Sequence, residues 1–182
     1  MYINVSGPLG YRAAEELFLS HRDDVKKRFS AEFIGQFLSL KDEALKSEDE
    51  FLRDKEALKD REIFIEAGQG GICAALWQLC ESYEALKAQT EGPVPTGCRI
   101  DLDRIPVKQE VIEMLELFGE SPYECDSRGA FVWLSEEWNE GSYIGRTTED
   151  RARVIEGKEI KRFLTPPLRQ EKDIMDRKKD RS

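Results

Sequence analysis

The stretch IEAGQGGICAALWQLCE, residues 65–81, decides the fold of this chain. Three glycines, Gly68, Gly70 and Gly71, follow an apolar run that ends at Ile65. After them, apolar residues recur at helical spacing, at positions 72, 76, 79, 83 and 86. Because side chains three and four positions apart share one helix face, the pattern predicts a strand, a tight turn and a helix that begins at Gly71.

The glycine turn has two physical interpretations. Backbone amides and the helix dipole at a helix start favour an anion, and glycine lets the anion approach closely. The lysine of a P-loop is missing, and Glu66 adds negative charge beside the turn. Glycines also permit positive φ and close packing of a helix on a sheet, which needs no ligand. We expect a packed strand-to-helix corner first and an anion site second.

The candidate binding residues lie in this turn or are expected close to it. Arg128, in the segment DSRG, either binds an anion near the turn or pairs with Asp126. The candidate residues for anion or substrate binding are Glu66, Gly68, Gln69, Gly70, Gly71 and Arg128. We assign no catalytic residue and no metal ligand.

Outward from this stretch, strand and helix patterns mix along the whole chain. A short strand at residues 2–5 and a turn with Gly7 and Gly10 precede a helical segment over residues 12–60. Strands are expected near residues 98–102, 129–135 and 142–146, a helix from Pro106 to Gly119, and a hairpin that turns at Glu156-Gly157. The sequence thus predicts one α+β domain, residues 1–164, and a charged, mobile tail, residues 165–182.

Composition excludes several classes of function. A net charge of −9 disfavours nucleic acid and anionic membrane surfaces. The four cysteines form no Cys-x-x-Cys pair, and His21 is the only histidine, so we expect free thiols and no zinc site. The chain has no signal pattern and no apolar run of membrane-spanning length, which predicts a cytoplasmic protein.

Four segments in one order resemble a known family. They are IEAGQGGICAALWQLCE, GCRIDLDRIPV, MLELFGESPY and SRGAFVWL. The series resembles the C-terminal domain of the aminoimidazole ribonucleotide synthetase (AIR synthase)-related superfamily, in the style of its hydrogenase maturation factor branch. The resemblance implies a three-layer α/β/α domain with a mixed sheet. It also implies a crossover near residues 136–141 that is shorter than the family's.

The resemblance sets the functional expectations. Family members pair an N-terminal ATP-binding domain with this domain and form their active sites between the two. No acidic, glycine-rich ATP-binding segment is present here, and the ending KKDRS lacks the terminal cysteine of the hydrogenase maturation branch. We therefore expect a non-catalytic binding or interaction protein without a cofactor of its own. Its partner would be a second copy or a separately encoded ATP-binding domain.

Two alternatives remain. The chain could be one half of a composite ATP-dependent enzyme or maturation factor, or a sensor of a small phosphate-bearing ligand. Both alternatives use the glycine turn, and only the first needs chemistry.

Overall fold

The structure, a computed structural model, describes residues 1–57, 63–90 and 92–167, without the side chains of residues 45–52 and 54–57. The predicted helix end at residues 58–60 and the tail residues 168–182 lie outside this part of the chain. The elements are β1 (Tyr2–Ser6), α1 (Tyr11–Ser20), α2 (Arg22–Arg28), α3 (Ala31–Ala57), β2 (Phe64–Glu66), α4 (Gly71–Thr90), β3 (Gly97–Asp101), a 3-10 turn (Leu102–Arg104), α5 (Gln109–Leu117), β4 (Phe131–Ser135), β5 (Tyr143–Thr148), β6 (Arg153–Glu156) and β7 (Lys161–Phe163).

One sheet contains all the described strands, in the order β2-β4-β1-β5-β3-β6-β7. The pair β3 and β6 is parallel, and the other neighbours are antiparallel. The sheet is therefore mixed, and the predicted α+β class is confirmed. The predicted closing hairpin is also confirmed, since β6 and β7 pair antiparallel and Gly157 donates its amide to the Ile160 carbonyl at 2.8 Å.

The connection from β4 to β5 is a loop without a helix, residues 136–142, and it crosses β1. Asn4 on β1 is fully buried and fixes this crossing. Its amide nitrogen donates to the Ser135 hydroxyl at 3.1 Å, and its amide oxygen accepts from the Ser142 hydroxyl at 3.3 Å. A buried side-chain amide needs such partners, so the loop is held closely on the strand.

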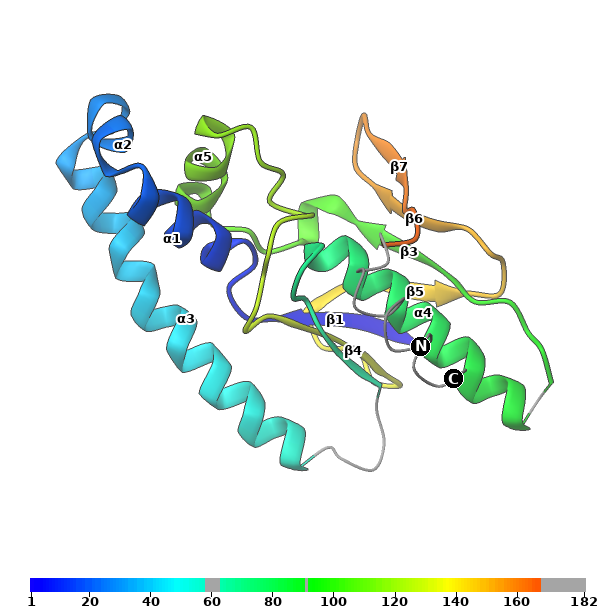
Figure 1. Ribbon diagram of the computed structural model, residues 1–182. Helices are drawn as coiled ribbons and strands as arrows, with labels where there is room; N and C mark the ends of the chain where they lie inside the picture. Colours follow the sequence, from blue (N-terminus) through cyan, green and yellow to red (C-terminus); the bar gives the residue numbers. More distant parts are fainter. Residues whose placement is uncertain (58–62, 91, 168–182) are drawn as a thin grey trace, which may run out of the picture.

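The helices form two groups (Figure 1). Helix α4 packs along the sheet, and its buried residues join the strands in one apolar core. Helices α1, α2, α3 and α5 gather at the other side of the view and share a second core, which includes Phe18, Phe37 and Met114. The turn that starts α4 lies at the boundary of the two groups, where the chain leaves β2.

Local signals in the sequence account for several helix ends. The Ser30 hydroxyl accepts the Phe33 amide at 3.2 Å and caps the start of α3. Gly119 has φ +73° and closes α5, because its amide donates to the Glu116 carbonyl and the Glu120 amide donates to the Leu115 carbonyl.

Two boundaries differ from the sequence prediction. The helical segment that was expected over residues 12–60 is broken at His21, whose φ of −127° and ψ of +38° are not helical. Helix α5 begins at Gln109 and not at Pro106, because Lys108 is extended at φ −70° and ψ 142°. The φ of proline fits an extended segment as well as a helix start, so Pro106 alone could not place the boundary.

Candidate functional site

The glycine turn is closed by contacts with the loop that follows α5. Gly70 and Gly71 have positive φ, +84° and +59°. A Cβ atom on Gly71 would lie 2.6 Å from the Tyr123 carbonyl oxygen and 2.7 Å from the Cys125 carbonyl oxygen. Only glycine fits this position, for its φ and for the space that it leaves.

Protein carbonyls already accept several amides at the start of α4. The Gly71 amide donates to Gly68 O at 3.0 Å, and the Ala74 amide donates to Gly70 O at 3.1 Å. The Cys73 amide donates to Tyr123 O at 3.1 Å. An anion at a helix start binds to amides that lack such partners. These three bonds reduce the donors that the turn offers to a ligand.

Ser127 connects three turns, and sequence reasoning did not single it out. It is fully buried. Its hydroxyl accepts the Gly10 amide at 2.8 Å and donates to Cys125 O at 3.2 Å, while its own amide donates to Gly68 O at 3.3 Å. Its place between Asp126 and Arg128 in DSRG was the only available signal. The partners of its hydroxyl come from distant segments, so the sequence could not show them.

Arg128 and Glu66 lie on one side of the turn. Arg128 Nε donates to Asp126 Oδ2 at 2.6 Å, which confirms the pairing alternative, and Arg128 Nη2 donates to Glu16 Oε1 at 3.0 Å. These bonds, with Asp126 as the larger contributor, raise the pKa of Arg128. Glu66 Oε1 accepts the Gly129 amide at 3.2 Å, so this carboxylate orients the turn before β4. Both side chains line an open cavity of about 400 Å³ with residues of α1.

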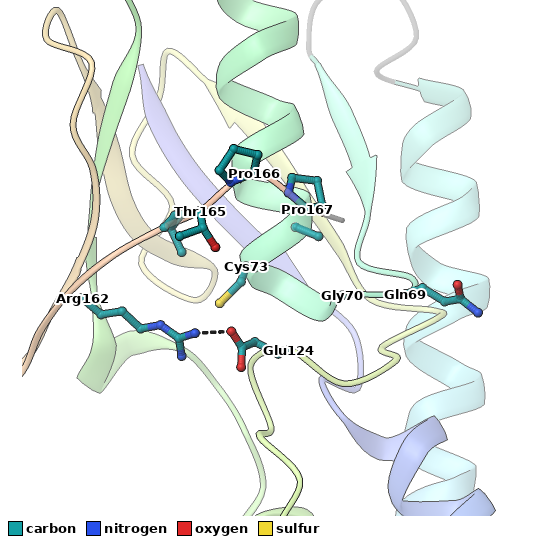
Figure 2. Close-up of a pocket in the computed structure, with 10 residues that line it drawn as sticks. Gln69, Gly70, Cys73, Glu124, Arg162, Thr165, Pro166 and Pro167 are labelled. Carbon is teal, nitrogen blue, oxygen red and sulfur yellow. Dashed lines mark hydrogen bonds and ion pairs between the residues drawn. The ribbon is translucent and has the colours of Figure 1, made fainter. Parts of the chain in front are cut away.

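Gln69 and Gly70 line a different cavity, of about 490 Å³ (Figure 2). Its other walls are Cys73 on α4, the ion pair of Glu124 with Arg162, and the segment Thr165–Pro166–Pro167. The Cys73 sulfur points toward the Glu124–Arg162 pair, and the Gln69 side chain points away from it. The candidate residues from the sequence are thus divided between two cavities, with Gly68 and Gly71 in the turn between them.

The Cys73 thiol is in its unreactive form near neutral pH. Burial raises its pKa to about 11, and nearby Arg162 opposes this shift only in part. The thiolate, not the thiol, is the nucleophile, so Cys73 is a weak nucleophile despite its place in a cavity.

Stability should fall at alkaline pH because of Cys73. The folded state holds the thiol proton more tightly than the unfolded state, whose thiol titrates near the ordinary value of 9.0. This contribution is complete below that value and is lost as the pH rises toward about 11. The expected loss is about 1.4 kcal/mol per pH unit within that window. Urea denaturation from pH 8 upward measures it. Cys73→Ser should remove this part of the slope, and an unchanged slope would contradict the assignment.

The described residues contain neither a cluster of metal-ligand side chains nor a membrane-spanning helix. Within residues 1–57, 63–90 and 92–167, no three His, Cys, Asp or Glu side chains gather as a metal site. None of the helices in that part of the chain has the length and apolar character to cross a bilayer. The described cysteines Cys73, Cys80, Cys98 and Cys125 are free thiols.

Comparison with known proteins gives a fold. No family model and no curated protein matches the chain. Among solved structures, a hydrogenase maturation protein HypE superposes with a TM-score of 0.61 and 16% identity, over 93% of this chain and 54% of that chain. The HypE of E. coli gives a TM-score of 0.57 and 19% identity, over 92% and 50% of the two chains. A thiamine monophosphate kinase from Aquifex aeolicus gives 0.49 and 20% identity, over 87% and 51%.

The fold is therefore of the AIR synthase-related class, as the sequence resemblance predicted. The two HypE hydrogenase maturation proteins superpose on more than nine tenths of this chain, with TM-scores of 0.61 and 0.57. The chain spans about half the length of these HypE proteins. At identities of 16% and 19%, these similarities establish the shared architecture alone.

Proposed function

We propose that this chain is a non-catalytic binding and interaction protein built on an AIR synthase-type lobe. The observation that supports this most is the state of the ionisable groups around the glycine turn. Arg128 is bonded to two carboxylates, Arg162 is paired with Glu124, and Cys73 is a neutral thiol. General acid–base catalysis needs a group whose pKa is near the working pH, and nucleophilic catalysis needs an activated nucleophile. These groups supply neither.

The partner would be a second copy of the chain or a separately encoded ATP-binding domain. Among the described strands, the β6–β7 hairpin lies at the edge of the sheet, and β7 pairs with β6 alone. Two large apolar side chains are exposed there, Ile160 at 57% and Phe163 at 60%. Exposed apolar residues at a strand edge are typical of a surface that another chain covers.

Light scattering coupled to size exclusion tests self-association. We expect a particle of about twice the 21.0 kDa chain mass. Phe163→Asp should shift it toward the monomer, because the substitution places a charge in the contact. Leu86→Asp, on α4 and also half exposed, is the matched control and should leave the mass unchanged. If the chain is a monomer at every concentration, the homodimer is excluded and a separately encoded ATP-binding domain is left as the proposed partner.

A second function, one half of a composite enzyme or a ligand sensor, is favoured by the cavity of about 490 Å³ beside the start of α4. In this proposal Gly68, Gln69, Gly70 and Gly71 contact a phosphate-bearing ligand. Glu66 and Arg128 lie on the opposite side of the turn and do not contact this ligand. Their bonds to Gly129 and Asp126 orient the loop before β4.

Thermal unfolding with ATP, inorganic phosphate or a nucleoside monophosphate separates the two functions. A ligand that binds only the folded state raises the melting temperature. The first proposal expects no rise at millimolar ligand. A rise that is lost in Arg162→Gln and kept in Arg146→Gln, an exposed arginine on β5, would favour the second.

A further inference from the structure

The face of the sheet opposite α4 carries two patches of opposite charge. Side chains of a strand alternate between the two faces of a sheet. Ile3 and Ile100 belong to the apolar core that contains α4, so their neighbours on β1 and β3 point to the opposite face. Neither apolar core includes a described side chain from this opposite face of β5, β3 or β7. This part of the sheet is therefore not covered by the core of the domain.

The first patch is a row of cations on neighbouring strands, Arg146, Arg99 and Lys161. Arg146 on β5 lies directly opposite Arg99 on β3, and Lys161 on β7 lies opposite Glu156 on β6. Glu156 Oε1 accepts from Arg99 Nη1 at 2.9 Å and lies 3.4 Å from Lys161 Nζ. Arg146 forms no ion pair with any described carboxylate. Like charges directly opposite each other on two strands are destabilising, so this cation row favours contact with additional negative charge.

The second patch is the acidic loop between β4 and β5, residues 136–142, which lies on the same face. The Asn4 side chain points to this face, and its bonds to Ser135 and Ser142 hold the loop over β1. Three exposed carboxylates of the loop form no ion pair with a described residue: those of Glu136, Glu137 and Glu140. Trp138, between them, is 52% exposed. The loop therefore presents unpaired negative charge around an exposed aromatic ring.

The two patches are complementary to each other. Among the described residues, no ion pair joins them within one chain. A two-fold axis brings the same surface of two copies together, so that one part of a copy contacts a different part of the other, twice. Such a rotation places the acidic loop of each copy on the cation row of the other. Phe163, 60% exposed at the β7 end of the row, adds a second exposed ring to this surface, and aromatic residues are enriched in protein interfaces.

We propose that two copies of the chain associate face to face through this side of the sheet, with the acidic loop of each on the cation row of the other. The inference rests on the homodimer of the proposed function and gives that homodimer its contact surface. A second copy is favoured over another acidic protein because the chain itself carries the complementary loop. It is favoured over nucleic acid because the three carboxylates of the loop would repel phosphates.

The proposed surface is separate from the ligand cavity. The cavity of about 490 Å³ is lined by Cys73 and Ala74 of α4, on the other side of the sheet. Substitutions on the cation row or the acidic loop therefore leave the walls of that cavity in place. Ligand binding and association through this face can thus be measured independently.

Charge reversal tests the contact, with the dimer dissociation constant measured by analytical ultracentrifugation. Arg146→Glu and Glu137→Arg each place like charges together at both symmetric contacts. Each variant alone should therefore have a dissociation constant about tenfold higher or more. In a mixed dimer of the two variants, one contact is the natural pair and the other is the reversed pair. Mixing them should restore the wild-type dissociation constant to within about twofold.

Matched controls use exposed charges on helices, Arg28→Glu on α2 and Glu81→Arg on α4. Both should keep the wild-type dissociation constant, alone and mixed. For the wild-type chain, a rise from about 50 mM to about 500 mM NaCl should weaken the dimer several-fold, because salt screens exposed charges.

The outcomes separate this inference from the proposed function. A dimer that neither charge reversal weakens would overturn the inference and leave the homodimer in place through another contact. Variants that weaken the dimer without restoration on mixing would also overturn the inference, because the two patches would then not contact each other. A monomer at every concentration would overturn both the inference and the homodimer, and leave the separately encoded ATP-binding domain as the proposed partner.

Discussion

Gly71→Ala is expected to destabilise the fold by about 2–5 kcal/mol. The new Cβ would lie 2.6 Å from Tyr123 O and 2.7 Å from Cys125 O, and both are backbone atoms that cannot rotate away. A left-handed backbone costs a residue with a Cβ roughly 1–2 kcal/mol, and overpacking adds about 1–3 kcal/mol. Urea denaturation monitored by circular dichroism measures the change.

Gly35→Ala is the matched control for this substitution. Gly35 lies within α3, and nothing is within 4 Å of the Cβ that alanine would add. Alanine is a better helix former, so the fold should gain up to about 1 kcal/mol. If Gly71→Ala costs less than about 1 kcal/mol, the turn can open. An open turn would favour an anion site over a packed corner.

Leu79→Ala is expected to destabilise the fold by about 2–5 kcal/mol. Leu79 is fully buried between α4 and the sheet, so its loss removes apolar contacts and leaves a cavity. Leu86→Ala on the same helix is the control, since Leu86 is 50% exposed and its truncation should cost about 0.5 kcal/mol or less. Chemical denaturation of the two variants compares them directly. Equal costs would mean that α4 is not docked on the sheet through this face.

Local patterns in the sequence predicted what short-range physics determines. The apolar spacing after Gly71 predicted α4, Gly119 predicted the end of α5, and the turn at Gly157 predicted the last hairpin. In each case the signal and its consequence lie within a few residues. The order of four motifs also predicted the fold class correctly.

Other features depend on contacts between distant segments. The parallel pairing of β3 with β6 joins residues more than fifty positions apart. The bonds of Ser127 to Gly10 and Gly68 arise in the same way. The break at His21 is local, but apolar residues at helical spacing continue beyond it, at Val25 and Phe29, so the sequence pattern did not show it. The sequence therefore identified the turn correctly and could not show how other loops fill it.

Phosphate release by the purified chain with ATP and Mg²⁺ tests the central claim most directly. A binding and interaction lobe without chemistry of its own should release phosphate no faster than buffer alone. A rate that increases in proportion to the protein concentration and falls in Arg128→Gln or Arg162→Gln would contradict the claim, since it would place turnover at the two cavities beside the glycine turn.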